Sequence, residues 1–367
     1  MSTLRDSKET QEKYWQDRAE KVILAAEKTA DEMNADSAKL YVEVEKAIKK
    51  EVEAFVGRYS RDAGVTLEEA RKALSKSELK SYLEQTQEYY NAIEATGYAF
   101  DPAYRQRLHR QLSLKSAVSR LEALQADVQW QVEKLAAQQQ SSFKTGMSAV
   151  YEDSYLRTTF DFQQALGVAS GFSSLNTRAI ESAISTKWLG ENYSSRIWAN
   201  KDRLTLNLER IIPQGIALGR NPRVIAKEIQ AALGVDKSNA ERLALTEFNR
   251  IAGLGRLKGY QAARIDKYRV SAVLDHKTSE ICEEMDGKVF NVNEYQVGIT
   301  ANPFHPRCRT VTVPNIPKDE FDEMYKRAIR LAQDEKGNII EIPADISFSR
   351  WRKGLVPIDD GKVRYAA

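Results

Sequence analysis

The chain has 367 residues and carries 55 Lys and Arg against 52 Asp and Glu, a formal net charge of +3 at pH 7. With 42% hydrophobic residues it is long enough to bury a sizeable core, and two or three domains are expected. The near balance of charge excludes the strongly basic composition typical of many nucleic-acid-binding proteins. The start of the chain lacks the pattern of a signal peptide, and no stretch approaches membrane-spanning length. We therefore expect synthesis in the cytoplasm and no membrane partner.

The first half is expected to form a helical bundle or an extended helical arm. Between about Thr10 and Leu166 the sequence is poor in Pro and Gly and rich in helix formers. Two apolar stripes recur there at helical spacing: Tyr41, Val44, Ile48, Val52 and Phe55, then Ala117, Leu121, Leu124, Val128 and Leu135. Each stripe must be covered by another helix. The second stripe approaches a heptad seam, but it is short, so an intramolecular core is favoured over a coiled-coil arm.

Capping and breaking residues predict where these helices begin and end. Gly57 is expected to end one helix, Thr66 with Glu69 and Ser75 with Glu78 to form capping boxes, and Asp101-Pro102 to start another helix. Further along, the run from Ser170 to Ser174 is expected to be a linker. After it, Asn221-Pro222 should open a helix that Gly234 closes, and Ser238 with Glu241 should cap the next, which runs to about Ala263.

A set of small residues lies inside that last predicted helix. Ala252, Gly255 and Gly259 fall on one face, where the missing side chains allow another backbone to approach closely. The run from Gly253 to Gly259 is not a nucleotide-binding loop, because its third glycine is one position too far and lies within a helix.

A change of pattern after Ile265 predicts a small α+β module. Residues 268–274 alternate and are rich in β-formers, Asp286-Gly287 is a turn, and residues 288–290 and 310–313 are short strands. Beyond Pro317 a helix is expected from about Glu320 to Ala332, followed by a tail. The fold class is therefore mainly α. Four segments are predicted: a helical arm or bundle at 1–170, a helical domain at 171–265, the module at 266–317, and a C-terminal helix and tail at 318–367.

Most of the metal-ligating side chains are clustered within that module. The chain has two cysteines, Cys282 and Cys308, which argues against a disulfide-stapled secreted fold, and two of its three histidines lie nearby, His276 and His305. His305 and Cys308 have a spacing at which one turn presents both to a single ion, with Cys282 and either His276 or Asp275 completing a tetrahedral set for structural Zn²⁺. A buried cysteine beside a turn-anchoring histidine, and a Cys282 to Cys308 disulfide, are the alternatives.

Signals for catalysis are incomplete. Cys282 or Cys308 with His305 and Asp286 could formally supply a nucleophile, a base and an orienting carboxylate, but such a combination is generic. Glu283 and Glu284 are adjacent, so they do not face one site together. We therefore expect no enzyme activity, no small-molecule substrate and no required cofactor.

Positive charge is mildly concentrated between Lys201 and Arg269, where 14 Lys and Arg stand against 7 Asp and Glu. The basic residues that could contact DNA phosphates there are Arg203, Arg210, Arg220, Arg223, Arg250, Arg256 and Lys258. A solvated helix face is the commoner explanation for such a segment.

One third of the chain, from about Trp188 to Pro314, carries an ordered set of motifs. They are Trp188-Leu189-Gly190, Asn192-Tyr193-Ser194, Arg196 to Asn200 with Trp198, Asn239 to Leu243, Thr246-Glu247, Leu274-Asp275, Thr278-Ser279, Ile281-Cys282, Asp286 to Phe290 with Gly287, His305-Pro306 and Cys308-Arg309. Taken together, these motifs resemble the phage head-morphogenesis family, the minor head proteins that include the Mu F-like group. In many relatives a second cysteine follows the arginine, where this chain has Thr310, and a basic residue precedes the Thr-Glu pair, where it has Leu245.

The resemblance implies a low-copy virion protein that is located inside the phage head, near the portal, and made in the host cytoplasm. The partners it implies are the portal protein and the scaffold or major capsid protein, with roles in head morphogenesis and in DNA packaging or ejection. A DNA-binding internal head protein that holds genomic DNA is one alternative. An enzyme or toxin carried on a head-protein module is another, which would need an appended catalytic domain, and about fifty residues after Pro314 are too few for one.

Overall fold

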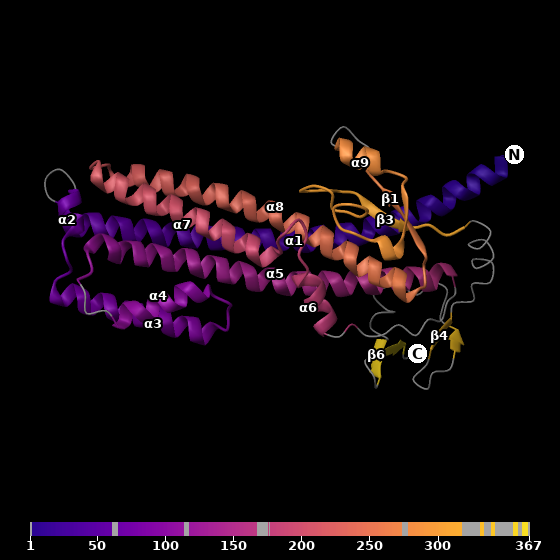
Figure 1. Cartoon of the computed structure of the whole chain (residues 1–367), viewed down its shortest axis with the longest axis horizontal. Coiled ribbons are helices and arrows are strands. Elements are labelled where there is room, and N and C mark those ends of the chain that lie inside the picture. The colour runs from indigo at the N-terminus through magenta and orange to yellow at the C-terminus, as the bar shows by residue number, and fades with distance from the viewer. Residues whose placement is uncertain are drawn as a thin grey trace. The chain divides into compact units, whose positions relative to one another are not determined.

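A computed structural model describes residues 2–60, 65–113, 117–166, 175, 177–273 and 278–317, together with four short strands between 331 and 365. Within these residues the fold is mainly α with a small three-stranded α+β module, as the sequence predicts (Figure 1). The helices of the first 262 residues are α1 (Ser2–Tyr59), α2 (Leu67–Arg71), α3 (Lys76–Thr96), α4 (Pro102–Ser113), α5 (Arg120–Leu166), α6 (Thr177–Ser185), α7 (Tyr193–Ala217) and α8 (Pro222–Ala262). In the described part of the chain, no helix combines the length and the apolar character needed to cross a membrane.

The capping chemistry predicted for the first half is confirmed at Ser75 and present in part at Thr66, where the Glu69 side chain pairs with Lys72 and Arg120 and does not close the box. Ser75 accepts from the backbone N–H of Glu78, and the Glu78 side chain accepts from the backbone N–H of Ser75, which is a complete capping box. Thr66 accepts from the N–H of Glu69 at the start of α2. Asp101 Oδ1 accepts from the N–H of Ala103 at 2.9 Å, where α4 begins.

Two predicted helix ends were wrong. Gly57 lies within α1, and Gly234 and Ser238 lie within α8, so each helix is continuous where a break was expected. A glycine in a helix interior costs only about 1 kcal/mol relative to alanine. The apolar stripe of α8 passes through the site without interruption, with Ile229 and Leu233 before Gly234 and Ala240 after it in one core. Burial of that stripe outweighs the local preference to stop.

The small module is an antiparallel sheet of three strands with the order β2-β1-β3. Its elements are β1 (Lys267–Ser271), α9 (Glu280–Met285), β2 (Val289–Asn291), the 3-10 turn η1 (Val292–Glu294) and β3 (Val311–Pro314). In the central strand, Arg269 pairs with Val289 on one side and with Val313 on the other. The turn predicted at Asp286-Gly287 is present, and Gly287 has a φ of +73°, a conformation that glycine adopts without strain.

The C-terminal segment differs from the prediction. β4 (Leu331–Gln333) pairs with β5 (Ile339–Glu341), and β6 (Leu355–Ile358) pairs with β7 (Lys362–Tyr365). The last two residues of the helix predicted from about Glu320 to Ala332 therefore belong to a strand, because pairing with a β-branched segment later in the chain overrides their local helix preference. The rest of that prediction, and the linker predicted from Ser170 to Ser174, lie outside the described residues.

The chain divides into two compact units, each built from segments that are not consecutive in sequence. Unit 1 comprises the described residues of 1–31, 145–192 and 244–367, and unit 2 those of 32–144 and 193–243. The long helices α1, α5 and α8 each contribute residues to both units.

Unit 2 contains an extended apolar core that the two predicted stripes help to form, and a smaller cluster around Trp130. Tyr41 to Phe55 of α1 and Leu121 to Leu135 of α5 pack with side chains of α7 and α8, among them Leu208 and Ile225. The second stripe is thus part of an intramolecular core, as favoured, except that Ala117 precedes α5 and is exposed.

Unit 1 contains the close helix contact predicted from the small residues of α8. A Cβ atom added to Gly255 would lie 2.6 Å from the backbone oxygen of Tyr151 in α5, and one added to Gly259 would lie 2.5 Å from a side-chain carbon of Thr158. The absent side chains allow the backbone of α8 to contact α5 directly.

Candidate functional site

A buried polar network surrounds one turn of α8 in unit 1. The indole Nε1 of Trp188 donates to Glu247 Oε1 at 2.8 Å, and the other oxygen of the same carboxylate accepts from Arg250 Nε at 2.8 Å. The Arg250 guanidinium also donates to the backbone oxygens of Ala183 and Ile184 at the end of α6. Glu247 and Arg250 are 0% and 1% exposed. The ion pair therefore holds α6 and the Trp188 turn onto α8.

The same stretch of α8 binds the loop that precedes β3. Asn249 donates to the backbone oxygen of Cys308 and accepts from Asn302, and Thr246 Oγ1 accepts from the N–H of Arg307 at 3.2 Å. Sequence reasoning missed the two asparagines. Asn249 lies three positions after Thr246, on the same face of α8, but this spacing indicates a site only once the loop that binds there is known.

Other motif residues build the module itself. Ser279 caps α9, and Asp286 Oδ1 accepts from the backbone N–H of Ala272 at 2.8 Å, just after β1. Thr278 Oγ1 donates to the backbone oxygen of Val273. These contacts fold the segment from β1 to β2 back on itself, so that α9 faces the loop before β3. Asp286 was considered above as the carboxylate that orients a catalytic base. In the structure its side chain stabilises this turn.

Cys282, His305 and Cys308 are brought together at that point. Cys282 Sγ lies 3.2 Å from His305 Nε2 and 3.7 Å from Cys308 Sγ, and the three ligand atoms lie within 4.8 Å of one another. Both cysteines are free thiols and are buried, while the His305 ring is half-buried. Asp275 and His276, the other ligands considered, lie outside the described residues.

The two thiols interact with each other and with Thr310. A hydrogen bond from the Cys308 thiol lowers the pKa of Cys282, since it stabilises the Cys282 thiolate. The same bond raises the pKa of Cys308, and burial adds to this effect. The nearby Thr310 hydroxyl acts in the lowering direction on the pKa of each thiol, which places position 310 beside the cluster.

The remaining motif residues lie in unit 2 or at the edge of the cluster. Arg196 and Trp198 belong to α7, where the ammonium of Lys201 lies 5.4 Å from the centre of the Trp198 ring. Pro306 and Arg309 flank the cluster in the loop before β3.

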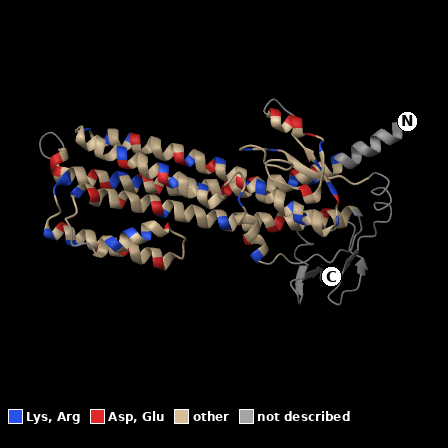
Figure 2. Ribbon diagram, viewed as in Figure 1, with Lys and Arg blue, Asp and Glu red and all other residues tan. Residues whose placement is uncertain are grey.

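The predicted DNA-contacting residues separate into two groups. Arg250 and Arg256 are buried and hydrogen-bonded within unit 1, Arg256 to the backbone oxygen of Thr312, so the prediction is wrong for these two. Arg203, Arg210 and Arg223 are exposed on α7 and α8, and Lys258 is half-buried. Arg220 pairs with Glu228 at 2.6 Å. In Figure 2, red segments of the ribbon, which mark Asp and Glu, are interspersed with the blue segments of Lys and Arg along α7 and α8.

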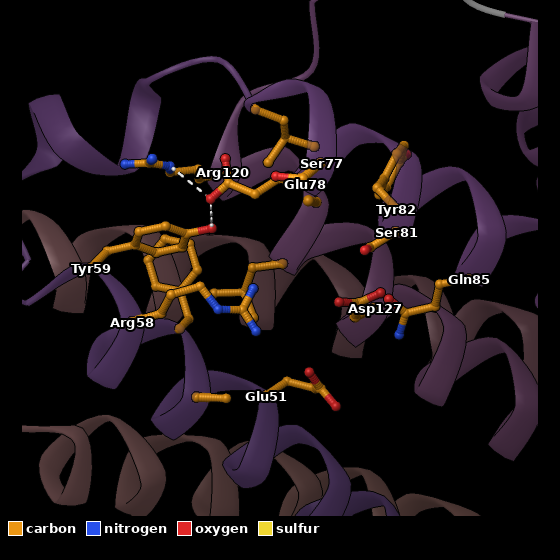
Figure 3. Close-up of a pocket in the computed structure, with 15 residues that line it drawn as sticks. Glu51, Arg58, Tyr59, Ser77, Glu78, Ser81, Tyr82, Gln85, Arg120 and Asp127 are labelled. Atoms are coloured by element: carbon orange, nitrogen blue, oxygen red, sulfur yellow. Dashed lines mark hydrogen bonds and ion pairs between the residues drawn. The ribbon is translucent and has the colours of Figure 1, made fainter.

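A polar pocket of about 330 Å³ lies in unit 2 among α1, α3 and α5 (Figure 3). In its upper part Tyr59 donates to Glu78 at 2.6 Å, and Arg120 lies 3.5 Å from the same carboxylate. These contacts lower the pKa of Glu78 to about 2, with the Tyr59 hydrogen bond as the largest cause. At the other side, burial raises the pKa of Asp127 to about 7, although Tyr89 donates to it at 3.1 Å. Among the charged residues that line the pocket, Glu78 and Arg120 are paired with each other. This pocket was not foreseen from the sequence.

Comparison with known proteins matches the region that holds the cluster and the α8 part of the network. Residues 207–313 match a family model described as Phage Mu protein F like protein, a range that includes Glu247, Arg250, Cys282, His305 and Cys308. No solved structure matches the chain significantly.

Two curated proteins are distant relatives. The chain is 25% identical over 244 residues to NAD(+)--arginine ADP-ribosyltransferase EFV of Enterococcus faecalis (strain ATCC 700802 / V583), a match that covers 56% of this chain and 50% of that protein. It is 24% identical over 147 residues to Minor head protein GP7 of Bacillus phage SPP1, covering 39% of this chain and 48% of that protein. The chain thus spans about half the length of these relatives.

Proposed function

We propose that the chain is a minor head protein of the phage Mu F-like group, a low-copy virion component that acts in head morphogenesis from inside the head, at the portal. The observation that carries this proposal is the match over residues 207–313. Many of the matched polar residues are used to hold helices, turns and loops together, as Glu247, Asn249 and Asp286 are.

Docking to a larger protein ring is supported by apolar side chains that unit 2 leaves in solvent. Leu206 and Leu218, on and just after α7, and Val235 on α8 are 61 to 66% exposed. Exposed apolar side chains on helices are the anchors by which a helix binds a groove of a partner. The scaffold or major capsid protein is a further candidate for the same surface.

Co-expression with the portal protein of the same genome tests this proposal. The tagged portal ring should retain the full chain, and a Leu206→Ser, Val235→Ser double variant should be retained less. Leu24→Ser is the matched control, because Leu24 is 61% exposed on α1 in unit 1. Failure of the wild-type chain to co-purify or to enter proheads contradicts portal association, and equal retention of all variants contradicts docking through α7 and α8.

A DNA-binding role inside the head is the second candidate, favoured by the exposure of Arg203, Arg210 and Arg223. Phosphate contacts make affinity fall as salt rises. In a gel-shift titration over salt concentration, binding with that dependence, lost in the triple Ala variant, would support this role. Absence of binding at low salt would exclude it.

The name of the Enterococcus relative raises the question of ADP-ribosyl transfer. The match covers half of that protein, so the name does not assign the activity to the matched half. We propose that this chain acts without turnover. Incubation with labelled NAD⁺ and an arginine-rich acceptor should give no labelled product, and transfer by the purified chain would overturn this part of the proposal.

A further inference from the structure

The Cys/His cluster joins two segments that are distant in sequence. Cys282 lies in α9, while His305 and Cys308 lie at the two ends of a turn before β3, 23 and 26 positions further along the chain. Within this turn the N–H of Cys308 donates to the His305 oxygen at 3.2 Å, and Arg307 has a φ of +58°. The turn therefore presents an imidazole and a thiol together to the thiol of α9.

Two of the three separations between the ligand atoms, those that involve Cys282, are close to the edges of a tetrahedral metal site. With Zn–S distances of about 2.3 Å and a Zn–N distance of about 2.0 Å, a tetrahedral ion separates two sulfurs by about 3.8 Å and a sulfur from a nitrogen by about 3.5 Å. The corresponding separations are 3.7 Å between the two Sγ atoms and 3.2 Å between Cys282 Sγ and His305 Nε2. The sulfur separation is far longer than the roughly 2.05 Å of a disulfide bond.

The imidazole of His305 is held in a ligating orientation. Its Nδ1 lies 2.8 Å from the backbone oxygen of Pro306, and a carbonyl oxygen only accepts, so Nδ1 carries the proton of that bond. In the neutral ring this leaves a lone pair on Nε2, the atom that faces Cys282. A hydrogen bond from the second ring nitrogen to a carbonyl is the usual outer support of a zinc-ligating histidine.

The surroundings of the cluster are also fixed. Cys282, Cys308 and Thr310 are 3%, 2% and 1% exposed. The Cys308 backbone is bound by Asn249 of α8, and the N–H of Cys282 is bound by the cap residue Ser279. The ligands are therefore positioned by the fold and need little rearrangement to receive an ion.

We propose that Cys282, His305 and Cys308 bind one Zn²⁺ ion that clamps α9 to the loop before β3. Two thiolates and an imidazole form a ligand set that suits Zn²⁺. The three ligands leave a fourth coordination position, and the buried Thr310 lies beside the sulfurs. The ion stabilises a module whose sheet has three short strands, and this inference does not depend on the function proposed above.

Metal titration of the reduced, metal-stripped full chain tests the site. One equivalent of Co²⁺ should produce thiolate-to-cobalt charge-transfer absorption and the d–d bands of tetrahedral cobalt, and Zn²⁺ should displace it. Hydrogen exchange measured by mass spectrometry should slow in the peptides around α9 and the loop before β3 when Zn²⁺ is bound.

Variants distinguish ligation from adventitious binding. His305→Gln and Cys308→Ser should each weaken Zn²⁺ binding by more than the roughly 10- to 100-fold that loss of an outer-shell partner causes. His109→Gln is the matched control, because His109 is exposed on α4, and it should bind like wild type. Thr310→Cys should bind Zn²⁺ more tightly than wild type, since it adds a third thiolate beside the other two.

The metal-binding measurements still test the proposal if His305→Gln or Cys308→Ser folds poorly. Metal binding by wild type and by Thr310→Cys does not depend on those variants. A folded, reduced wild-type chain that takes up no stoichiometric metal overturns the proposal. Cobalt spectra without thiolate charge transfer do so as well, as does Zn²⁺ affinity that is unchanged in a folded His305→Gln variant.

Discussion

The two units bury charge in different ways. In unit 1 the acid and the base, Glu247 and Arg250, are one helical turn apart on α8, and they are fully buried. In unit 2 the buried Lys201 of α7 reaches Glu133 of α5 at 2.9 Å and Asp101, before α4, at 3.1 Å. One ion pair is local in sequence and organises its surroundings, whereas the other joins three separate segments. A local pair can be noticed in a sequence, but a long-range set becomes visible only in the fold.

The two buried ion pairs also differ in whether the residue that is left can become neutral when its partner is removed. Arginine stays protonated at any ordinary pH, so Arg250 cannot become neutral if its partner is lost. Burial raises the pKa of Glu133, so this carboxyl can take up a proton. Burial alone would lower the pKa of Lys201, but hydrogen bonds from its ammonium to Asp202, Glu133 and Asp101 raise it.

The largest effect is expected for Glu247→Ala in unit 1. It leaves the buried Arg250 charge unpaired and Trp188 without its acceptor, so we expect a loss of about 3–5 kcal/mol in the stability of unit 1. Hydrogen exchange resolved by peptide measures it, with faster exchange in unit 1 peptides than in those of unit 2. Glu247→Gln keeps an acceptor for Trp188 and should lose less. Equal exchange in Glu247→Ala and wild type would show that the ion pair does not hold unit 1 together.

Lys201→Met should destabilise unit 2 by on the order of 3 kcal/mol at neutral pH. The loss should shrink as the pH falls, because Glu133 without its ammonium partner becomes protonated and no longer carries an uncompensated charge. Exchange in unit 2 peptides at several pH values is the measurement. Lys227→Met on the exposed face of α8 is the control, and a Lys201→Met loss that does not vary with pH would contradict the contrast with Arg250.

Two glycines of α8 give opposite predictions. Gly255→Ala places a Cβ against the backbone of Tyr151, which cannot move as a side chain can, so a loss of about 1–3 kcal/mol is expected. Gly234→Ala meets nothing within 4 Å and should stabilise the helix by about 0.5–1 kcal/mol. Thermal unfolding of the two variants compares them directly. If Gly255→Ala and Gly234→Ala shifted the unfolding temperature by similar amounts in the same direction, α8 would not pack tightly on α5.

The smallest effect is expected in the pocket of unit 2. The pKa of Asp127 is raised from 3.8 to about 7, so between about pH 4 and 7 the folded chain holds a proton that the unfolded chain has lost. Stability therefore falls as the pH rises through this window. Asp127→Asn, which still accepts from Tyr89, should flatten that slope and stabilise unit 2 by on the order of 1 kcal/mol above pH 7, allowing for the partial exposure of the side chain.

Glu84→Gln on the exposed face of α3 is the control for Asp127, since the Glu84 side chain is 64% exposed. It should leave the slope of stability against pH unchanged. An unaltered slope in Asp127→Asn would place the titrating group elsewhere.

The sequence predicts much of the local chemistry of this fold. The capping box at Ser75, the turn at Gly287 and the close approach at Gly255 depend on a few neighbouring residues, and all three are present. The gathering of Cys282, His305 and Cys308 was also anticipated, because the segment that contains them is short enough to fold as one module.

Features that depend on distant partners were not predicted. The continuity of α8 through Gly234 follows from a core shared with α1, α5 and α7. Arg250 is indistinguishable from a surface arginine until Glu247, Trp188 and the end of α6 are placed around it. The strand at Leu331–Gln333 needs a pairing segment later in the chain.

Quantitative mass spectrometry of purified proheads and mature particles tests the assignment as a minor head protein most directly. We predict that the chain is present in these particles at a copy number far below that of the major capsid protein. Its absence from both proheads and particles, while it is abundant in the lysate, would contradict the assignment.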